Sequence, residues 1–192
     1  MAILVSGGAG YIGSHTCIEL LNAGYDIVVA DNYYNASPVV LDRVKQITGK
    51  DFRFYKADMT RREDVEKIFS ECPDITAVIQ FAAYKAVGES VSKPIEYYYN
   101  NLNCTLVILD VMRHHDCHNF VFSSSATVYG DPASVPPNRH PHIQTPIFFI
   151  PFMFIYSTLL INSLKALLNS SGRSMFIMCP QSSSTNILPL GK

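Results

Sequence analysis

A glycine-rich turn between an apolar strand and a helix constrains this chain more than any other feature. Residues 2–5 form a short β-prone run, and apolar residues recur with helical spacing from Tyr11 to Leu21, with Ile12, Cys17, Ile18 and Leu21 on one side. The glycines of the segment Val5–Gly13 therefore lie where the strand passes into the helix. Because glycine has no Cβ, the backbone can turn tightly there, and a pyrophosphate can reach the N–H groups at the positive end of the helix. The turn predicts a dinucleotide-binding site.

An acidic residue at the end of the next strand narrows the choice of dinucleotide. Asp31 follows the apolar run Ile27–Ala30, which is typical of a buried parallel strand. A carboxylate at this position accepts hydrogen bonds from ribose hydroxyls and repels a 2′-phosphate. The alternative is an ordinary acidic residue at a strand end, which the neighbouring glycines disfavour. We therefore expect NAD as the cofactor rather than NADP.

Composition and charge fit one soluble α/β domain with a small-molecule ligand. The 192 residues carry 15 basic and 16 acidic side chains, a net charge of −1, so there is no electrostatic case for nucleic acid as a partner. The five cysteines are scattered without a Cys-x-x-Cys pair, as expected of reduced thiols in a cytoplasmic protein. The first apolar run lacks a basic leader, so we expect no signal peptide.

Strand and helix patterns then alternate along the chain. Strands are expected at residues 52–57, 77–81 and 119–123, and helices at 62–71 and 95–114, where Leu102, Leu106, Leu109 and Val111 are available to face the sheet. This order predicts a doubly wound parallel sheet of the Rossmann type. In such a sheet ligands bind at the carboxyl ends of the strands, where the loops collect.

Those loops carry a family resemblance. Four motifs, Gly7–His15, Asp31-Asn32, Lys85–Ser90 and Phe122–Asp131, resemble those of UDP-glucose 4-epimerases in the extended short-chain dehydrogenase/reductase family. The resemblance covers residues 1 to about 135. It implies an NAD-binding Rossmann domain at 1–135, followed by a divergent apolar tail at 136–192. It also implies a sheet that is incomplete at its C-terminal side and the interconversion of UDP-glucose and UDP-galactose as the activity. Because the substrate domain is lacking, we expect binding of the UDP-sugar to be weak or lost.

The resemblance assigns roles residue by residue. It implies pyrophosphate binding by the glycine turn, ribose binding around Asp31, contact with adenine after the third strand, and contact with the middle of the cofactor after the fourth. The implied cofactor residues are Gly7, Gly10, Tyr11, Ile12, Gly13, Asp31, Asn32, Asn35, Asp58, Met59, Phe81, Ala82, Ala83, Lys85 and Asn100. Ser125 would hydrogen-bond the 4-hydroxyl of the sugar. Ala83 and Tyr84 stand where the family usually has glycine and leucine, and would crowd the dinucleotide.

The family's catalytic pair is absent from this chain. In the family a tyrosine acts as the base, and a lysine four residues later on the same helix face lowers its pKa. No tyrosine here has a lysine at that spacing. Tyr156 is the nearest candidate, but it is followed at the matching position by Leu160, which cannot stabilise a phenolate. Three interpretations remain open: an impaired epimerase, a catalytically silent NAD-binding fragment or pairing subunit, or an unstable remnant that binds nothing well.

The tail departs further from the family. Residues 143–164 contain no Asp, Glu, Lys or Arg. They are consistent with a degraded catalytic helix followed by a strand at 175–178, with a membrane anchor, or with sequence that arose by a frameshift or alternative splicing. About 20 apolar residues suffice to span a bilayer, but Pro146 and Pro151 interrupt this run and disfavour the membrane reading.

Two smaller clusters have ordinary structural interpretations. The sequence His114–His118 lies between a helix end and a strand, where histidines complement the helix dipole, and we expect no metal there. Tyr97–Tyr99 fits helix packing. The family resemblance implies that this helix lies beside the cofactor and contributes to a homodimer contact.

Overall fold

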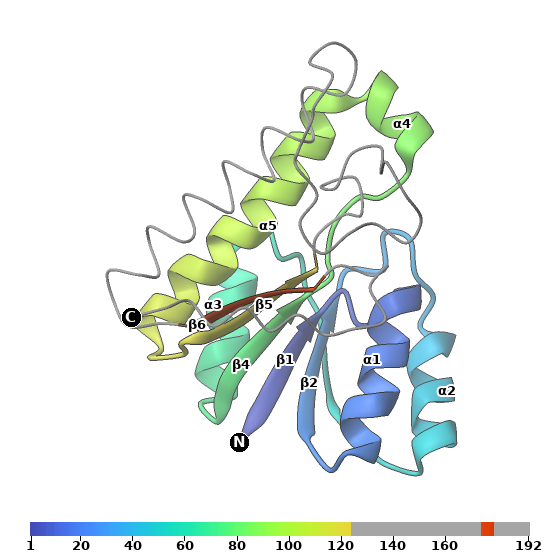
Figure 1. The fold of residues 1–192 in the computed structure, drawn as a ribbon, viewed down its shortest axis with the longest axis vertical. Helices are drawn as coiled ribbons and strands as arrows, with labels where there is room; N and C mark the ends of the chain where they lie inside the picture. The colour runs from blue at the N-terminus through green and yellow to red at the C-terminus, as the bar shows by residue number, and fades with distance from the viewer. Residues whose placement is uncertain (124–173, 179–192) are drawn as a thin grey trace, which may run out of the picture. The chain divides into compact units, whose positions relative to one another are not determined.

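The computed structural model describes residues 1–123 and the short strand at residues 174–178 (Figure 1). The chain divides into two compact units, Met1–Val121 and Phe122–Lys192. In the second unit only the end of β5 and strand β6 (Ser174–Met178) are described, and β6 matches the strand expected in the tail. All other elements belong to the first unit.

The first unit alternates strands and helices, except that two helices follow one another between its fourth and fifth strands. Its strands are β1 (Ala2–Ser6), β2 (Asp26–Asp31), β3 (Arg53–Lys56), β4 (Ile75–Gln80) and the start of β5 (Asn119–Ser123). Its helices are α1 (Tyr11–Asn22), α2 (Val39–Thr48), α3 (Arg62–Glu71), α4 (Val87–Ser92) and α5 (Pro94–His114). The strand order is β3-β2-β1-β4-β5, and β1 runs parallel to both β2 and β4, as β3 does to β2. The predicted doubly wound parallel sheet is confirmed.

The strand register brings the loops of interest to one edge. Ser6 pairs with Ala30 of β2 and with Gln80 of β4, and Asp31 pairs with Lys56 of β3. The carboxyl ends of these four strands are therefore level. The loops that follow them, including the glycine turn, emerge side by side.

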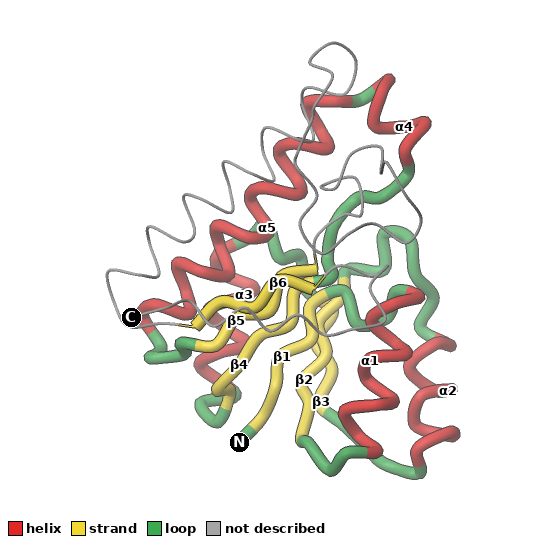
Figure 2. The backbone as a smooth tube through the Cα atoms, viewed as in Figure 1, coloured by secondary structure: helices red, strands yellow, loops and turns green. Residues whose placement is uncertain are grey.

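Apolar strands buried on both faces form the core. Leu4, Val28 and Val78 have no exposed surface, and Figure 2 shows α1 and α2 on one side of the sheet and α3 and α5 on the other. Buried residues of α1 and α2, such as Cys17 and Leu41, pack in one cluster with those of β1 and β2. Within the described residues, no helix combines the length and the apolar character needed to cross a bilayer.

The structure corrects several local expectations. Helices α2 and α4 were not predicted. α2 ends at Thr48, and Gly49 caps it with a φ of 64°, the left-handed conformation that glycine adopts after helix ends. β4 begins two residues earlier than expected, and Phe81 lies just beyond it. Ile12 does not join the buried face of α1, because it lies in the exposed first turn. Leu106 is exposed, since the buried face of α5 follows Cys104, Ile108 and Val111.

Candidate dinucleotide site

The glycine turn is packed so closely that side chains do not fit. Gly7 has a φ of +73°, and a Cβ at this position would lie 2.6 Å from the backbone nitrogen of Ala82. A Cβ on Gly13 would lie 2.2 Å from the carbonyl oxygen of Gly7. The amide of Gly7 donates to the carbonyl of Ala30 over 2.8 Å. Helix α1 thus starts directly against the turn, which is held between β2 and the loop after β4.

The first turn of α1 presents backbone amides without a side-chain cap. Gly10 is the N-cap residue and makes no side-chain cap hydrogen bond, and the first turn carries no acidic residue. Tyr11 and Ile12 are both exposed. The first N–H groups of a helix have no acceptor inside it and carry partial positive charge. The arrangement therefore fits an anionic group such as a pyrophosphate.

Asp31 links β2 to the glycine turn. Its side chain is nearly buried, with Oδ2 accepting from the Ala9 amide at 3.1 Å and Oδ1 accepting from the Tyr33 amide at 2.8 Å. Each carboxylate oxygen can accept a further hydrogen bond, so the group remains able to hold a ribose hydroxyl. The sequence predicted the position of Asp31, but gave no sign that it also fixes the turn.

The other residues expected on the adenosine side lie on neighbouring loops. Asn32 and Asn35 are exposed, and Asn32 Oδ1 accepts from the Tyr34 amide at 2.9 Å. Asp58 Oδ1 accepts from both the amide and the hydroxyl of Thr60, at 2.9 and 2.7 Å, which shapes the turn after β3. The next residue, Met59, is buried. These side chains come from loops that follow β2 and β3, at the same sheet edge as the glycine turn.

A buried polar pair holds the loop after β4 against the glycine turn. The Ser6 hydroxyl donates to Gln80 Oε1, and Gln80 Nε2 donates to the carbonyl of Ala82 over 2.8 Å. The amide of Phe81 donates to the carbonyl of Ser6 over 2.9 Å. The expected cofactor residues Phe81, Ala82 and Ala83 are half-buried, whereas Lys85 is exposed.

Sequence reasoning named Asn100 but missed the role of its neighbour Asn101. Asn101 Oδ1 accepts from the Tyr84 amide at 2.7 Å, and its Nδ2 donates to the Tyr84 carbonyl over 3.1 Å. Asn100 Nδ2 in turn donates to Asn101 Oδ1 over 3.0 Å. Asn101 therefore clamps the loop after β4 to α5. The adjacent amide side chains of Asn100 and Asn101 are the signal that could have indicated this position.

The expected catalytic residues lie outside the described residues. This holds for Ser125, for Tyr156 with Leu160, and for the apolar run at 143–164.

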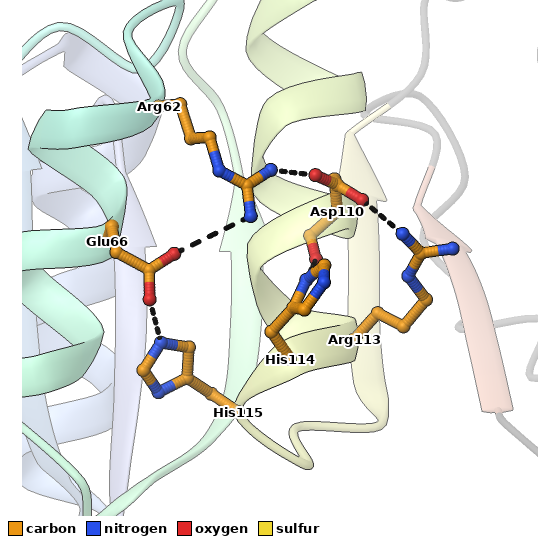
Figure 3. Close-up of polar contacts among 6 residues, drawn as sticks. All are labelled: Arg62, Glu66, Asp110, Arg113, His114 and His115. Atoms are coloured by element: carbon orange, nitrogen blue, oxygen red, sulfur yellow. Dashed lines mark hydrogen bonds and ion pairs between the residues drawn. The ribbon is translucent and has the colours of Figure 1, made fainter.

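The histidine cluster takes part in an ion-pair network between α3 and α5 (Figure 3). His115 Nε2 lies 2.5 Å from Glu66 Oε1, and Arg62 joins Glu66 to Asp110. Hydrogen bonding to His115 holds the pKa of Glu66 below its usual range, although burial opposes this. His114 Nδ1 lies 2.7 Å from the carbonyl of Asp110, near the helix end. The part of the chain that the structure describes contains no group of three or more metal-ligating side chains.

Residues 3–151 match the NAD dependent epimerase/dehydratase family. The chain belongs to this family. It is 59% identical over 136 residues to the UDP-glucose 4-epimerase of Bacillus subtilis, and 54% identical over 138 residues to UDP-glucose 4-epimerase 2 of Arabidopsis thaliana. These matches cover 71% and 70% of this chain, but only 40% and 39% of those proteins. The resemblance predicted from the loop motifs is confirmed.

Solved structures agree with this assignment. A UDP-glucose 4-epimerase from Bifidobacterium longum, crystallised with NAD+ and UDP, superposes with a TM-score of 0.78 and is 46% identical. The Stenotrophomonas maltophila enzyme, with bound NAD and a formylated UDP-arabinopyranose, also gives 0.78 at 34% identity. Each match covers 93% of this chain and 52% of the solved chain. The chain thus spans about half the length of these enzymes.

Proposed function

We propose that this chain binds NAD at the glycine turn and forms the cofactor-binding part of a UDP-glucose 4-epimerase site. The observation that carries the proposal is the turn itself, where a Cβ on Gly7 or Gly13 would collide with backbone and where Asp31 is tied to Ala9. Of the described helices, only α1 has no acidic residue in its first turn, which leaves its first amides available to an anion. The match to NAD-binding epimerases supports the same ligand.

Bound NAD would supply the acceptor for the hydride of C4 of the sugar, while the proton of the 4-hydroxyl would pass to a base, and both would return in the reverse step with the hydride on the opposite face. The amides of Tyr11 and Ile12 hold the pyrophosphate. Asp31 accepts from the ribose hydroxyls and excludes a 2′-phosphate by charge repulsion. Asn32, Asn35, Asp58 and Met59 surround the adenosine, and Phe81–Ala83, Lys85 and Asn100 line the middle of the cofactor. Ser125 orients the 4-hydroxyl of the UDP-sugar.

A second candidate function is NAD binding without turnover. It is favoured by one specific observation: no tyrosine in the chain is followed four residues later by lysine. A phenol without a nearby positive charge keeps a pKa of about 10 and is a poor base near neutral pH. In this form the chain acts as a silent cofactor-binding module or as the partner of a complete subunit.

Nucleotide analysis and a turnover assay separate these functions. The purified chain is denatured in acid and the released nucleotide is identified, and UDP-galactose is then supplied while UDP-glucose is measured. Bound NAD with turnover that Tyr156→Phe abolishes supports the epimerase, whereas bound NAD without turnover supports the silent module. Asp31→Asn should weaken NAD binding, while Asp26→Asn, at the exposed opposite end of β2, should not. Protein that neither carries nor binds NAD would contradict both functions.

We also infer a homodimer and a cytoplasmic location. Helix α5 exposes Ile95, Tyr99 and Leu106 at spacings that place them on one face, and α4 exposes Val87 and Val91. Such an apolar stripe suits a second copy of the chain. Among the described residues, the thiols of Cys17, Cys72 and Cys104 are buried and form no disulfide, which supports a reducing compartment.

A further inference from the structure

Two tyrosines meet between the loops that flank the glycine turn. Because β1 lies between β2 and β4 in the sheet, the loops after β2 and β4 emerge on either side of the turn after β1. Tyr34 comes from the first of these loops and Tyr84 from the second. Their ring centroids lie 4.5 Å apart, with 30° between the ring planes. This contact, here called the tyrosine bridge, therefore joins the two sides of the proposed cofactor site.

The Tyr84 side of the bridge is firmly anchored. Asn101 holds both the amide and the carbonyl of Tyr84. The Tyr84 ring also packs edge-on against Tyr97, at a centroid distance of 5.3 Å. The Tyr97 hydroxyl donates to Glu89 Oε2 over 2.8 Å, which connects the ring to α4. Two helices, α4 and α5, thus fix the position of this ring.

The Tyr34 side is held far more loosely. Tyr34 is 59% exposed, and its amide donates to Oδ1 of Asn32, two residues earlier in the same loop. The preceding residue, Tyr33, has a φ of 60°, an uncommon left-handed conformation for a bulky residue. Asp31 and Phe54 hold the amide and the ring of Tyr33, so the exposed Tyr34 side chain, rather than the loop backbone, can rotate away from Tyr84.

We propose that the tyrosine bridge closes over the bound dinucleotide and that the movement of Tyr34 controls its entry and release. This inference rests on the proposed NAD binding. Because the contact is made by two side chains of the chain itself and needs no ligand, it obstructs association as well as dissociation. Removal of the Tyr34 ring should therefore accelerate both steps and leave the dissociation constant nearly unchanged.

Stopped-flow fluorescence with NADH tests this directly. NADH is mixed with the full chain to obtain the association rate, and excess NAD then displaces it to give the dissociation rate. An aromatic contact of this kind corresponds to a factor of about two to ten in an equilibrium constant, so Tyr34→Ala should raise both rates by about that factor. Tyr34→Phe keeps the ring and should behave as wild type. Tyr25→Ala, an exposed tyrosine at the opposite end of β2, is the matched control.

Each outcome bears on the proposal. Parallel increases in both rates for Tyr34→Ala, and for Tyr84→Leu if the first variant is unstable, support the bridge. An increase in the dissociation rate alone would show that Tyr34 contacts the cofactor directly, and would overturn the bridge, as would unchanged rates. If the wild-type chain binds no NADH, the proposed function fails and the bridge fails with it. Binding with unaltered kinetics defeats the bridge alone.

Discussion

Gly13→Ala should break the contact between α1 and the glycine turn. The added methyl group would lie 2.2 Å from the Gly7 carbonyl oxygen and 2.8 Å from the Gly8 Cα, and both atoms belong to backbone that cannot rotate away. Overpacking of this kind costs about 3 kcal/mol at the upper end of its usual range. The higher helix propensity of alanine offsets about 1 kcal/mol of this cost at most. The net expectation is a loss of about 2 kcal/mol in the free energy of unfolding.

Gly88→Ala provides the matched control for this loss. Gly88 also lies in the first turn of a helix, α4, but a Cβ there would meet no atom within 4 Å. The same substitution should therefore be neutral or stabilise the chain by up to about 1 kcal/mol.

Urea unfolding followed by circular dichroism measures both variants. A loss of 2 kcal/mol lowers the midpoint by about 1 M urea for a slope of about 2 kcal/mol per molar. Gly13→Ala should also bind NADH about ten- to a hundredfold more weakly, since displaced amides lose hydrogen bonds to a charged group. Equal stability of Gly13→Ala and Gly88→Ala would refute the close packing on which the site depends.

Three further predictions concern the loop clamp, pH and assembly. Asn101→Leu should lower the free energy of unfolding by about 1–3 kcal/mol in urea titrations, because two backbone groups of Tyr84 lose their partner; Asn22→Leu, at an exposed position, should have little effect, and equal losses would contradict the clamp. Burial raises the pKa of the Cys17 thiol from 9.0 to about 12. The unfolded chain therefore releases this proton at lower pH than the folded chain, and stability should fall as the pH rises from 9 towards 12. Urea midpoints at pH 8 and pH 10 check this, and the midpoint of Cys17→Ala should fall less between the two. An equal fall in both proteins would show that another group causes the pH dependence. Tyr99→Asp should shift a dimer to monomer in light scattering, whereas Tyr25→Asp should not, and a wild-type monomer at all concentrations would exclude the proposed homodimer.

The sequence predicted those parts of the fold that local pattern determines. Buried parallel strands such as Ile27–Ala30 are continuous apolar runs, and the turn after β1 needs glycine for steric reasons that are local to it. Helix α2 was missed because only Leu41 and Val44 are buried in it, so its apolar stripe is narrow.

The remaining features depend on contacts between distant residues. Asn101 clamps Tyr84 across 17 positions, and the second role of Asp31 depends on the amide of Ala9, 22 positions away. The tyrosine bridge likewise joins loops that follow different strands. No local periodicity encodes such contacts, because they arise only when the sheet order places the loops side by side. Ser125 and Tyr156 lie outside the described residues, so their roles stay predictions.

The most direct measurement is a titration of the isotopically labelled chain with NAD, followed through its backbone amide NMR signals. If the glycine turn holds the pyrophosphate, the amides of Tyr11, Ile12 and Gly13 should show the largest shifts and saturate together. Signals at the far end of β2, such as that of Asp26, should stay in place. Saturating NAD that leaves the amides of the first turn of α1 unmoved would contradict the proposed site.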